Sequence, residues 1–352
     1  MNKDINKIEF APSKYLKSLR DKMVPELSFS ANNKQEFAKW RKKISKKLTE
    51  LLGGFPEEKC PLNPQIFESV EFERYFREKV VIESNPNCFV PVYVFVPKTV
   101  KKPFPAVVAV HGHGRGMKYT AGVWDSEEER RDIELVNHDY GRQFAEKGYM
   151  VFAPEMIGFG LRREDEDKLA GNGNHSCRIL SWHAAITGKT AIGLRVWDVI
   201  RVIDYAETRE ECNAKKKIGC AGLSGGATVT LYTAALEKRI KCAVVSGYFN
   251  TYEDSILAMH HCDCNYIPGI RKYAEMSDVA SMIAPRALLI EAGTKDEIFP
   301  IEATKTAYEK LKNSYRILHV EDHLDIDIQE GGHRFYGVKA FDWMDRWLKK
   351  VK

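Results

Sequence analysis

A serine set between glycines is the residue of this chain best suited to nucleophilic chemistry. Ser224 lies in the G-L-S-G-G run 222–226, directly after the strand-like run 217–221 and before a helix-compatible stretch, 227–236. In a G-x-S-x-G sequence placed between a strand and a helix, the sharp turn exposes the serine hydroxyl. The glycines let the strand and the helix pass closely without Cβ clashes. We therefore predict that Ser224 is a nucleophile.

A serine hydroxyl needs a base to take its proton, and that base needs an acid to orient it. The acid is expected in a turn after a later strand, and Asp296 follows the apolar run 287–292. Glu297 is the nearest alternative. Glu291 lies inside the strand-like run and is disfavoured because its side chain would have to point sideways. We predict Asp296 as the acid.

The base is expected in a loop before the last helix, and His333 follows a pair of glycines there. Glycines permit a loop that swings an imidazole back over a sheet. His319 and His323 are the competitors, the first within the preceding predicted strand and the second just after it. We predict His333 as the base.

Ester cleavage also needs two backbone N–H groups that stabilise a negative oxygen, each worth roughly 3 kcal/mol of barrier. One comes from the residue after the nucleophile, which is Gly225. The other is expected from the loop after an earlier strand. The glycine-rich run 111–116 follows the strand-like run 106–110. We predict that the N–H of His113 completes this oxyanion hole, with Gly114 as the alternative.

Histidines and cysteines near these motifs raise the question of a metal ion, because histidine is a common metal ligand. His111 and His113 alternate as in a strand extension, but no acidic third ligand has a recognisable spacing. The run 260–264, HHCDC, looks more like a metal cluster, yet no second C-x-x-C or H-x3-H accompanies it. We predict no metal site and interpret 260–264 as a pocket wall, with reactive thiols as the alternative.

Charged residues outside these motifs are predicted to be mainly structural. Asp198 and Arg201 are three residues apart in a helical pattern and could pair. Arg162 and Arg163 follow a glycine-containing turn. They could bind an acidic substrate group or belong to a solvated loop.

The elements that must position these residues alternate between strands and helices. Predicted buried strands are 106–110, 149–153, 218–221, 242–246 and 287–292, with 316–320 a shorter, more polar candidate. Predicted helices are 139–147, 190–208, 227–237, 302–313 and 335–350, and the strands 71–77, 79–83 and 89–96 form an antiparallel start. This alternation indicates an α/β fold with a mostly parallel sheet. Three long segments, 112–138, 155–189 and 248–284, follow strands and are predicted lids or pocket walls.

Length and composition set wider limits. The 352 residues, 44% of them hydrophobic, suit a large α/β domain, which we place at 66–352 after a helical extension at 1–65. A net charge of +5 over this length is too weak to indicate nucleic acid as a partner. The sequence shows no apolar run of the roughly 20 residues that span a bilayer, and residues 1–10 lack the apolar core of a secretory signal. Eight scattered cysteines favour free thiols in the cytoplasm.

Five blocks occur in an order that resembles the α/β-hydrolase superfamily, within it serine esterases related to dienelactone hydrolases and acetyl xylan esterases. The blocks are 111–114, 153–160, 222–226, 284–296 and 332–333. The resemblance implies an eight-stranded, mostly parallel sheet flanked by helices, no cofactor, and hydrolysis of carboxylic esters by Ser224, Asp296 and His333. Three departures leave the subfamily open: serine instead of cysteine as nucleophile, a longer N-terminal extension, and His-Gly-His-Gly in the oxyanion loop.

The leading hypothesis is a serine carboxylesterase acting through an acyl-enzyme on small esters with short acyl groups, including acetyl esters of carbohydrates. A peptidase of the prolyl oligopeptidase type is a second hypothesis, but the segment before the first parallel strand is too short for a propeller. A non-catalytic binding protein on the same scaffold is a third, and the complete Ser/Asp/His set argues against it. No membrane partner is expected, and a homo-oligomer is left open.

Overall fold

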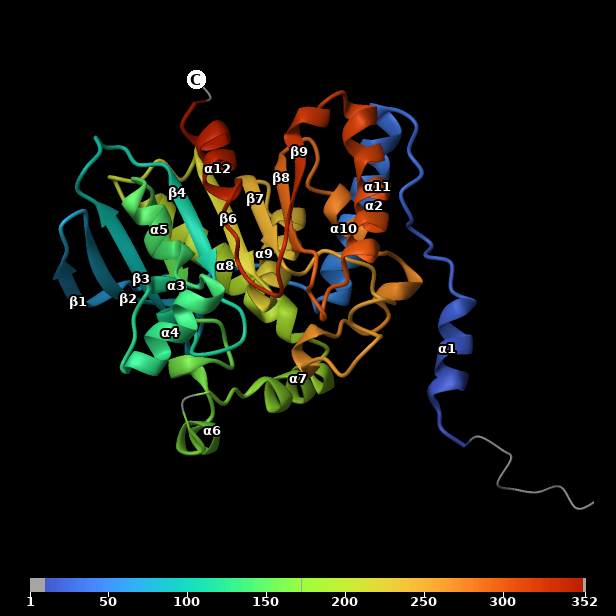
Figure 1. Ribbon diagram of the computed structural model, residues 1–352, viewed down its shortest axis with the longest axis horizontal. Helices are drawn as coiled ribbons and strands as arrows, with labels where there is room; N and C mark the ends of the chain where they lie inside the picture. Colours follow the sequence, from blue (N-terminus) through green and yellow to red (C-terminus); the bar gives the residue numbers. More distant parts are fainter. Residues whose placement is uncertain (1–9, 172, 351–352) are drawn as a thin grey trace, which may run out of the picture.

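A nine-stranded sheet forms the centre of this computed structural model, which describes residues 10–171 and 173–350 (Figure 1). The order across the sheet is β1-β2-β3-β5-β4-β6-β7-β8-β9. The strands are β1 (Gln65–Glu71), β2 (Tyr75–Asn85), β3 (Cys88–Pro97), β4 (Ala106–Val110), β5 (Met150–Pro154), β6 (Ile218–Leu223), β7 (Ile240–Ser246), β8 (Ala287–Gly293) and β9 (Leu324–Gln329). β1, β2, β3 and β5 are neighbours in antiparallel pairs, and every pair from β5 to β9 is parallel.

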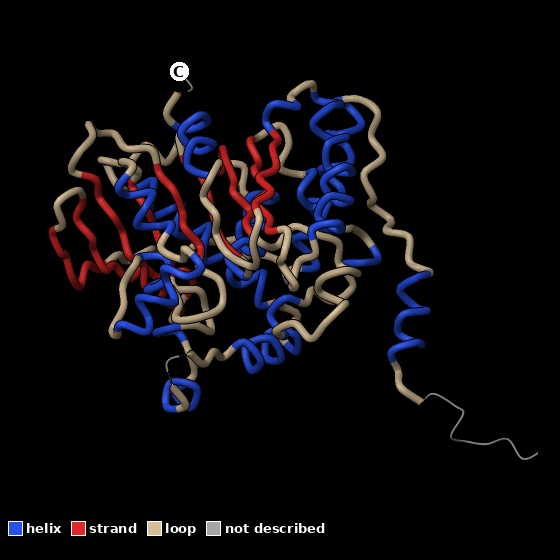
Figure 2. The backbone as a smooth tube through the Cα atoms, viewed as in Figure 1, coloured by secondary structure: helices blue, strands red, loops and turns tan. Residues whose placement is uncertain are grey.

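Helices cover both faces of the sheet, so the central strands are buried on both sides (Figure 2). Helices that pack in the two core clusters include α2 (Lys34–Leu51), α5 (Tyr140–Glu146), α8 (Ala191–Thr208), α9 (Gly225–Leu236), α11 (Ile301–Leu318) and α12 (Ala340–Leu348). Val108 of β4 packs in the cluster formed with α2, α8, α9 and α11, whereas Val107 and Ala109 pack with α5 and α12. The five apolar runs predicted as buried strands form β4 to β8, which confirms the mostly parallel α/β fold. The sheet has one strand more than the eight expected.

The remaining helices are short or peripheral. They are α1 (Ser13–Asp21), α3 (Met117–Ala121), α4 (Glu127–Val136), α6 (Asp165–Leu169), α7 (Cys177–Ile186) and α10 (Met276–Ser281), joined by the 3-10 turns η2 (Gly160–Arg162), η3 (Asp263–Asn265), η4 (Ile270–Lys272) and η5 (Glu321–His323). The long segments 112–138, 155–189 and 248–284 therefore carry helical structure of their own. Within the described residues, no helix is both long and apolar enough to cross a membrane.

The prediction of a strand at 316–320 is wrong. α11 continues to Leu318 because Leu311 and Tyr315, one helical turn apart, are both fully buried against the core. The last strand is β9, whose Leu324, Ile326 and Ile328 alternate with polar residues along the sheet edge. His319 therefore ends a helix rather than lying in a strand.

Two other element boundaries differ from the sequence prediction. The predicted strand 71–77 spans the turn between β1 and β2, because β1 is an exposed edge strand without a buried face to reveal it. The last helix begins at Ala340 rather than at Phe335. The backbone N–H groups of Tyr336 and Gly337 donate to the Glu291 carboxylate, which holds that segment outside the helix.

Candidate active site

Ser224 lies on a strained turn between β6 and α9. Its φ of 57° and ψ of −121° fall in a region that side chains other than glycine rarely adopt. A Cβ on Gly222 would lie 2.4 Å from the Gly226 carbonyl, and a Cβ on Gly226 would lie 1.9 Å from the Val110 carbonyl oxygen. Both flanking positions therefore require glycine, and the turn has the strand-elbow-helix form predicted from the sequence.

Asp296 and His333 meet in the loops that follow β8 and β9. The Nδ1 atom of His333 is 2.8 Å from Oδ2 of Asp296, and the Asp296 carboxylate is buried. Its other oxygen, Oδ1, accepts hydrogen bonds from the backbone N–H groups of Ile298 (2.9 Å) and Phe299 (3.1 Å). These bonds fix the carboxylate so that Oδ2 can accept a hydrogen bond from the Nδ1–H group of His333. The neighbouring Glu297 is exposed to solvent.

The second ring nitrogen of His333 is left free to act as a proton acceptor. Nε2 is buried and has no hydrogen-bond partner among the described residues. With the proton on Nδ1 directed at Asp296, the lone pair on Nε2 is available. The competing histidines lie elsewhere: His319 is exposed at the end of α11, and His323 contacts the Pro285 carbonyl oxygen at 2.6 Å.

Close packing of backbone around His333 sets the position of its ring. A Cβ on Gly247, directly after β7, would lie 3.0 Å from Cε1 of His333. A Cβ on Gly293, the last residue of β8, would lie 2.5 Å from the Gly331 carbonyl oxygen. The Phe299 ring stacks beside the imidazole, with 5.8 Å between the ring centres. The glycines therefore allow the histidine loop to approach the sheet closely.

Glu291, disfavoured as the acid, holds the histidine loop from within the sheet. Its carboxylate accepts hydrogen bonds from the hydroxyl of Ser246 (2.6 Å) and from the N–H groups of Tyr336 and Gly337 (both 2.7 Å). Burial raises the pKa of Glu291 to about 7, although these three donors act in the opposite direction. The sequence signal was an acidic residue inside an otherwise apolar strand, which needs buried polar partners.

Ser224 and His333 line the same cavity, of about 370 Å³. Gly225, Ile298 and Phe299 line it as well. The other lining residues come from two of the three long segments: Gly112, His113, Val136 and His138 from the first, and Met259, His260, His261, Cys262 and Asn265 from the third. None of the described residues of the segment 155–189 lines this cavity. Burial lowers the pKa of His138 to about 4, with a smaller contribution from the charges of His333 and His111. His138 is therefore neutral at pH 7.

The loop after β4 packs directly on the serine turn. A Cβ on Gly112 would lie 2.8 Å from the Leu223 carbonyl oxygen and 3.3 Å from Cβ of Ser224. A Cβ on Gly225 would lie 3.1 Å from Nδ1 of His113. The structure thus brings His113 and Gly225, the two predicted oxyanion-hole residues, side by side at Ser224.

His111 has a structural role in the same loop. Its Nδ1–H donates to the Gly112 carbonyl oxygen (2.7 Å), and its Nε2 accepts a hydrogen bond from the N–H of Met156 (2.9 Å). Both ring nitrogens of His111 are therefore held by backbone groups of the two loops. His111 therefore ties the loop after β4 to the loop after β5.

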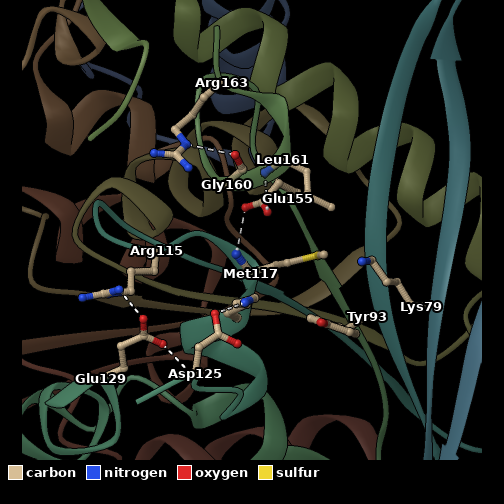
Figure 3. Close-up of a pocket in the computed structure, with 11 residues that line it drawn as sticks. Lys79, Tyr93, Arg115, Met117, Asp125, Glu129, Glu155, Gly160, Leu161 and Arg163 are labelled. Atoms are coloured by element: carbon tan, nitrogen blue, oxygen red, sulfur yellow. Dashed lines mark hydrogen bonds and ion pairs between the residues drawn. The ribbon is translucent and has the colours of Figure 1, made fainter. Parts of the chain in front are cut away.

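Glu155, a residue that sequence reasoning missed, strengthens the same connection. It lies at a separate pocket of about 180 Å³, which neither Ser224 nor His333 lines (Figure 3). The buried Glu155 carboxylate accepts hydrogen bonds from the N–H groups of Met117 (2.9 Å) and Leu161 (3.3 Å). A Cβ on Gly116 or on Gly160 would lie 1.9 Å from a Glu155 oxygen. The sequence signal that could have identified Glu155 is its position: it is an acidic residue directly after a buried strand, between two glycine-containing loops.

The charged residues outside the motifs have structural roles, as predicted, but the suggested pairing of Asp198 with Arg201 is wrong. Asp198 pairs with Arg162 (2.6 Å) rather than with Arg201, and Arg201 pairs with Asp204 (2.6 Å). The Arg162 and Asp198 side chains are only 8% and 3% exposed, so Arg162 is not available to an acidic substrate group. The Arg163 guanidinium donates to the carbonyl oxygens of Gly160 and Gly171 and braces its own loop. The partner of Asp198 is thus decided by a tertiary contact between α8 and the loop after β5, whereas Arg201 pairs within α8.

Comparison with known proteins places this architecture in a family. A family model described as "Abhydrolase family" matches residues 11–346. "Putative hydrolase YtaP" of Bacillus subtilis (strain 168) is 27% identical over 311 residues, which cover 86% of this chain and 98% of that protein.

Solved structures share the fold at low sequence identity. A crystal structure of "a putative acetyl xylan esterase" from Bacteroides fragilis has a TM-score of 0.77 at 18% identity, covering 92% of this chain and 84% of that one. A glucuronoyl esterase from Solibacter usitatus has a TM-score of 0.67 at 16% identity, covering 98% of both chains. The match to the family model over nearly the whole chain confirms the resemblance to α/β-hydrolases, and the chain belongs to the Abhydrolase family.

Proposed function

We propose that this protein is a serine esterase that cleaves carboxylic esters, with Ser224 as nucleophile, His333 as base and Asp296 as the acid that orients the base. The observation that carries the proposal is the 2.8 Å contact between His333 Nδ1 and Asp296. It leaves Nε2 of His333 without a partner among the described residues, and His333 and Ser224 line the same cavity. A serine on a strained elbow, a histidine and a carboxylate in this arrangement form the constellation that activates a hydroxyl for acyl transfer.

The reaction follows from the positions of these groups. The Ser224 hydroxyl oxygen attacks the ester carbonyl carbon while Nε2 of His333 takes the hydroxyl proton. The carbonyl oxygen becomes negative and is stabilised by the N–H groups of Gly225 and His113, the two residues adjacent at Ser224. The imidazolium then gives its proton to the departing alcohol oxygen, which leaves an acyl-enzyme. Water, deprotonated by His333, then attacks the acyl carbon. The bond from that carbon to the Ser224 oxygen breaks, the imidazolium returns its proton to the Ser224 oxygen, and the carboxylic acid leaves.

We propose small esters with short acyl groups, such as acetylated carbohydrates, as the substrate class. The cavity of about 370 Å³ lies near the lower end of the range of small-molecule pockets, roughly 300–1,000 Å³. Structures with the same fold include an acetyl xylan esterase from Paenibacillus sp. R4, with a TM-score of 0.58 at 17% identity over 95% of this chain and 99% of that one. A panel of p-nitrophenyl esters from acetyl to octanoyl, together with acetylated sugars, tests the acyl length. The cytoplasmic location expected from the sequence stays a prediction.

Replacement of the nucleophile tests the assignment. Ser224→Ala is expected to lower kcat for p-nitrophenyl acetate by at least about 10³-fold, because loss of a triad serine removes the covalent route. Ser314→Ala is the matched control, since Ser314 is a buried serine of α11 whose hydroxyl, among the described residues, bonds only the Leu311 carbonyl oxygen.

A fluorophosphonate probe provides the second readout. It is expected to label the wild type and Ser314→Ala on the peptide that contains Ser224, and to leave Ser224→Ala unlabelled. Turnover or labelling that survives in Ser224→Ala would show that another residue is the nucleophile. A folded wild type that neither reacts with the probe nor cleaves any ester would support the binding-protein hypothesis instead.

A further inference from the structure

One histidine and three cysteines, distant in the sequence, converge beside the proposed active site. The ligand atoms of His113, Cys177, Cys262 and Cys264 all lie within 4.8 Å of one another. His113 comes from the loop after β4, Cys177 is the first residue of α7, and Cys262 and Cys264 lie before and within η3. Each of the three long segments thus supplies at least one member, and α7 packs against η3.

The spacing of these atoms matches the edges of a tetrahedron around one zinc ion. With Zn–S of about 2.3 Å and Zn–N of about 2.0 Å, tetrahedral geometry places two sulfurs about 3.8 Å apart and a sulfur and a nitrogen about 3.5 Å apart. Sγ of Cys264 is 3.5 Å from Sγ of Cys262 and 3.4 Å from Nε2 of His113. Sγ of Cys177 is 4.0 Å from the same Nε2.

A buried arginine without a carboxylate partner indicates that this cluster carries negative charge. Arg195 of α8 is 3% exposed. Its guanidinium donates to the Ile157 carbonyl oxygen and to Sγ of Cys177 (3.2 Å), and among the described residues no Asp or Glu forms an ion pair with it. A buried charge normally needs a partner of opposite sign. Thiolates at the cluster would supply that partner.

We propose that His113, Cys177, Cys262 and Cys264 form a structural zinc site that joins the three long segments next to the active site. Binding would release three thiol protons to solvent and use the neutral Nε2 of the imidazole. Three thiolates and one Zn²⁺ carry a net charge of −1, which Arg195 offsets. Four protein ligands leave no open position, so the ion holds structure rather than binding substrate. Three soft sulfur donors and one imidazole favour zinc over magnesium or calcium.

The site would also fix the loop that carries the proposed oxyanion donor. With Nε2 bound to the ion, the ring proton of His113 stays on Nδ1, the nitrogen that faces Gly225. The metal–ligand bonds would then connect His113 to α7 and η3 through the ion. They would fix the orientation of the His113 ring and the position of the backbone next to Ser224. Sequence reasoning rejected a metal at His113 and at 260–264 because it weighed each alone; only the fold brings the two together with Cys177.

Metal content of the purified full-length protein tests the proposal without reference to activity. After dialysis, elemental analysis is expected to find roughly one zinc per chain. After removal of metal with a chelator under reducing conditions, the protein should rebind zinc, and cobalt(II) should give the absorption typical of thiolate ligation. Ser224→Ala should bind the same amount, so failure of the esterase proposal would not affect this result.

Ligand variants locate the site. Cys177→Ser is the most informative, because Cys177 does not line the active-site cavity. It should lower zinc affinity by at least about 100-fold, more than outer-shell changes usually do. Cys60→Ser is the control, since Cys60 is a half-buried cysteine whose thiol bonds only the Glu83 carbonyl oxygen within the part of the chain that the structure describes.

Two results on the wild type would overturn the proposal even if every variant failed to fold. One is that the reduced, chelator-treated wild type binds neither zinc nor cobalt while its thiols react freely. The other is that the protein purified without reductant holds a disulfide among Cys177, Cys262 and Cys264, seen as a mass lower by two hydrogen atoms, and binds no metal after reduction. Unchanged zinc affinity in a folded Cys177→Ser would also contradict it.

Discussion

The glycine beside the histidine ring offers a direct test of how the fold positions His333. Gly247 has a φ of +58°, and a Cβ there would lie 3.0 Å from Cε1 and 3.2 Å from Nδ1 of His333. Gly247→Ala should therefore have two effects. The alanine is strained in a left-handed conformation, and its methyl group pushes the imidazole by a few tenths of an ångström.

The two effects have different magnitudes and different readouts. A left-handed conformation costs a non-glycine residue roughly 1–2 kcal/mol, which lowers the free energy of unfolding by that amount. Displacement of the ring disturbs the 2.8 Å contact with Asp296 and the direction of Nε2. A misplacement of 1 Å at a catalytic group can cost about 100-fold in rate. For a smaller shift we expect kcat/KM to fall about 10- to 100-fold, or about 1.4–2.7 kcal/mol.

A second glycine separates strain from displacement. Gly54 has a φ of +70°, and a Cβ there would have no atom within 4 Å. Gly54→Ala should therefore lose a similar 1–2 kcal/mol of stability and keep its kcat/KM. Stability is measured by urea unfolding, and kcat/KM with p-nitrophenyl acetate. If Gly247→Ala keeps kcat/KM within about twofold of the wild type, or if Gly54→Ala loses as much activity as Gly247→Ala, contact with a Cβ at position 247 does not displace His333.

Three further tests probe the buried charges. Glu155→Gln should destabilise the protein by roughly 1–3 kcal/mol, because an amide NH₂ group would face one of the two backbone N–H donors. An unchanged midpoint of urea unfolding would show that Glu155 does not hold the two loops together. Arg162→Met should cost roughly 3–5 kcal/mol because it leaves buried Asp198 unpaired, and adding Asp198→Asn should recover part of this loss; a purely additive double variant would contradict the coupling. Burial raises the pKa of Glu291 from 4.5 to about 7, so the native state binds more protons between these values. The contribution of Glu291 to the free energy of unfolding should therefore fall by about 3 kcal/mol as the pH rises from about 4.5 to about 7, and it should stay level above that range. Urea unfolding at a series of pH values should show that Glu291→Gln lacks this slope. An identical pH dependence in both proteins would show that Glu291 does not titrate there.

Local patterns in the sequence predicted most of the elements that carry the site. Continuous apolar runs identified β4 to β8, because strands buried on both faces cannot carry exposed polar residues. Where burial is one-sided, the patterns failed. The edge strands β1 and β9 were misplaced, and α11 was cut short.

The predicted catalytic residues Ser224, Asp296 and His333 came from local signals: a glycine-framed serine, an aspartate after a buried strand, and a histidine before the last helix. The topology of a parallel sheet brings the carboxyl ends of its strands to one edge. Residues that follow different strands can therefore be placed at one site from their order alone. The structure adds the contact between His333 and Asp296 and the free Nε2.

Which distant side chains meet depends on the folded chain and not on any local pattern. Glu291 and Glu155 hold loops from buried positions, Arg162 pairs across to α8, and Cys177 joins His113 and the cysteines near η3. Such contacts depend on how long loops fold over the sheet, and loop conformation leaves no periodic pattern in the sequence. The sequence by itself therefore determined the architecture of the sheet and the chemistry at its strand ends. The packing of the loops determined the shape of the cavity and the four-residue cluster beside it.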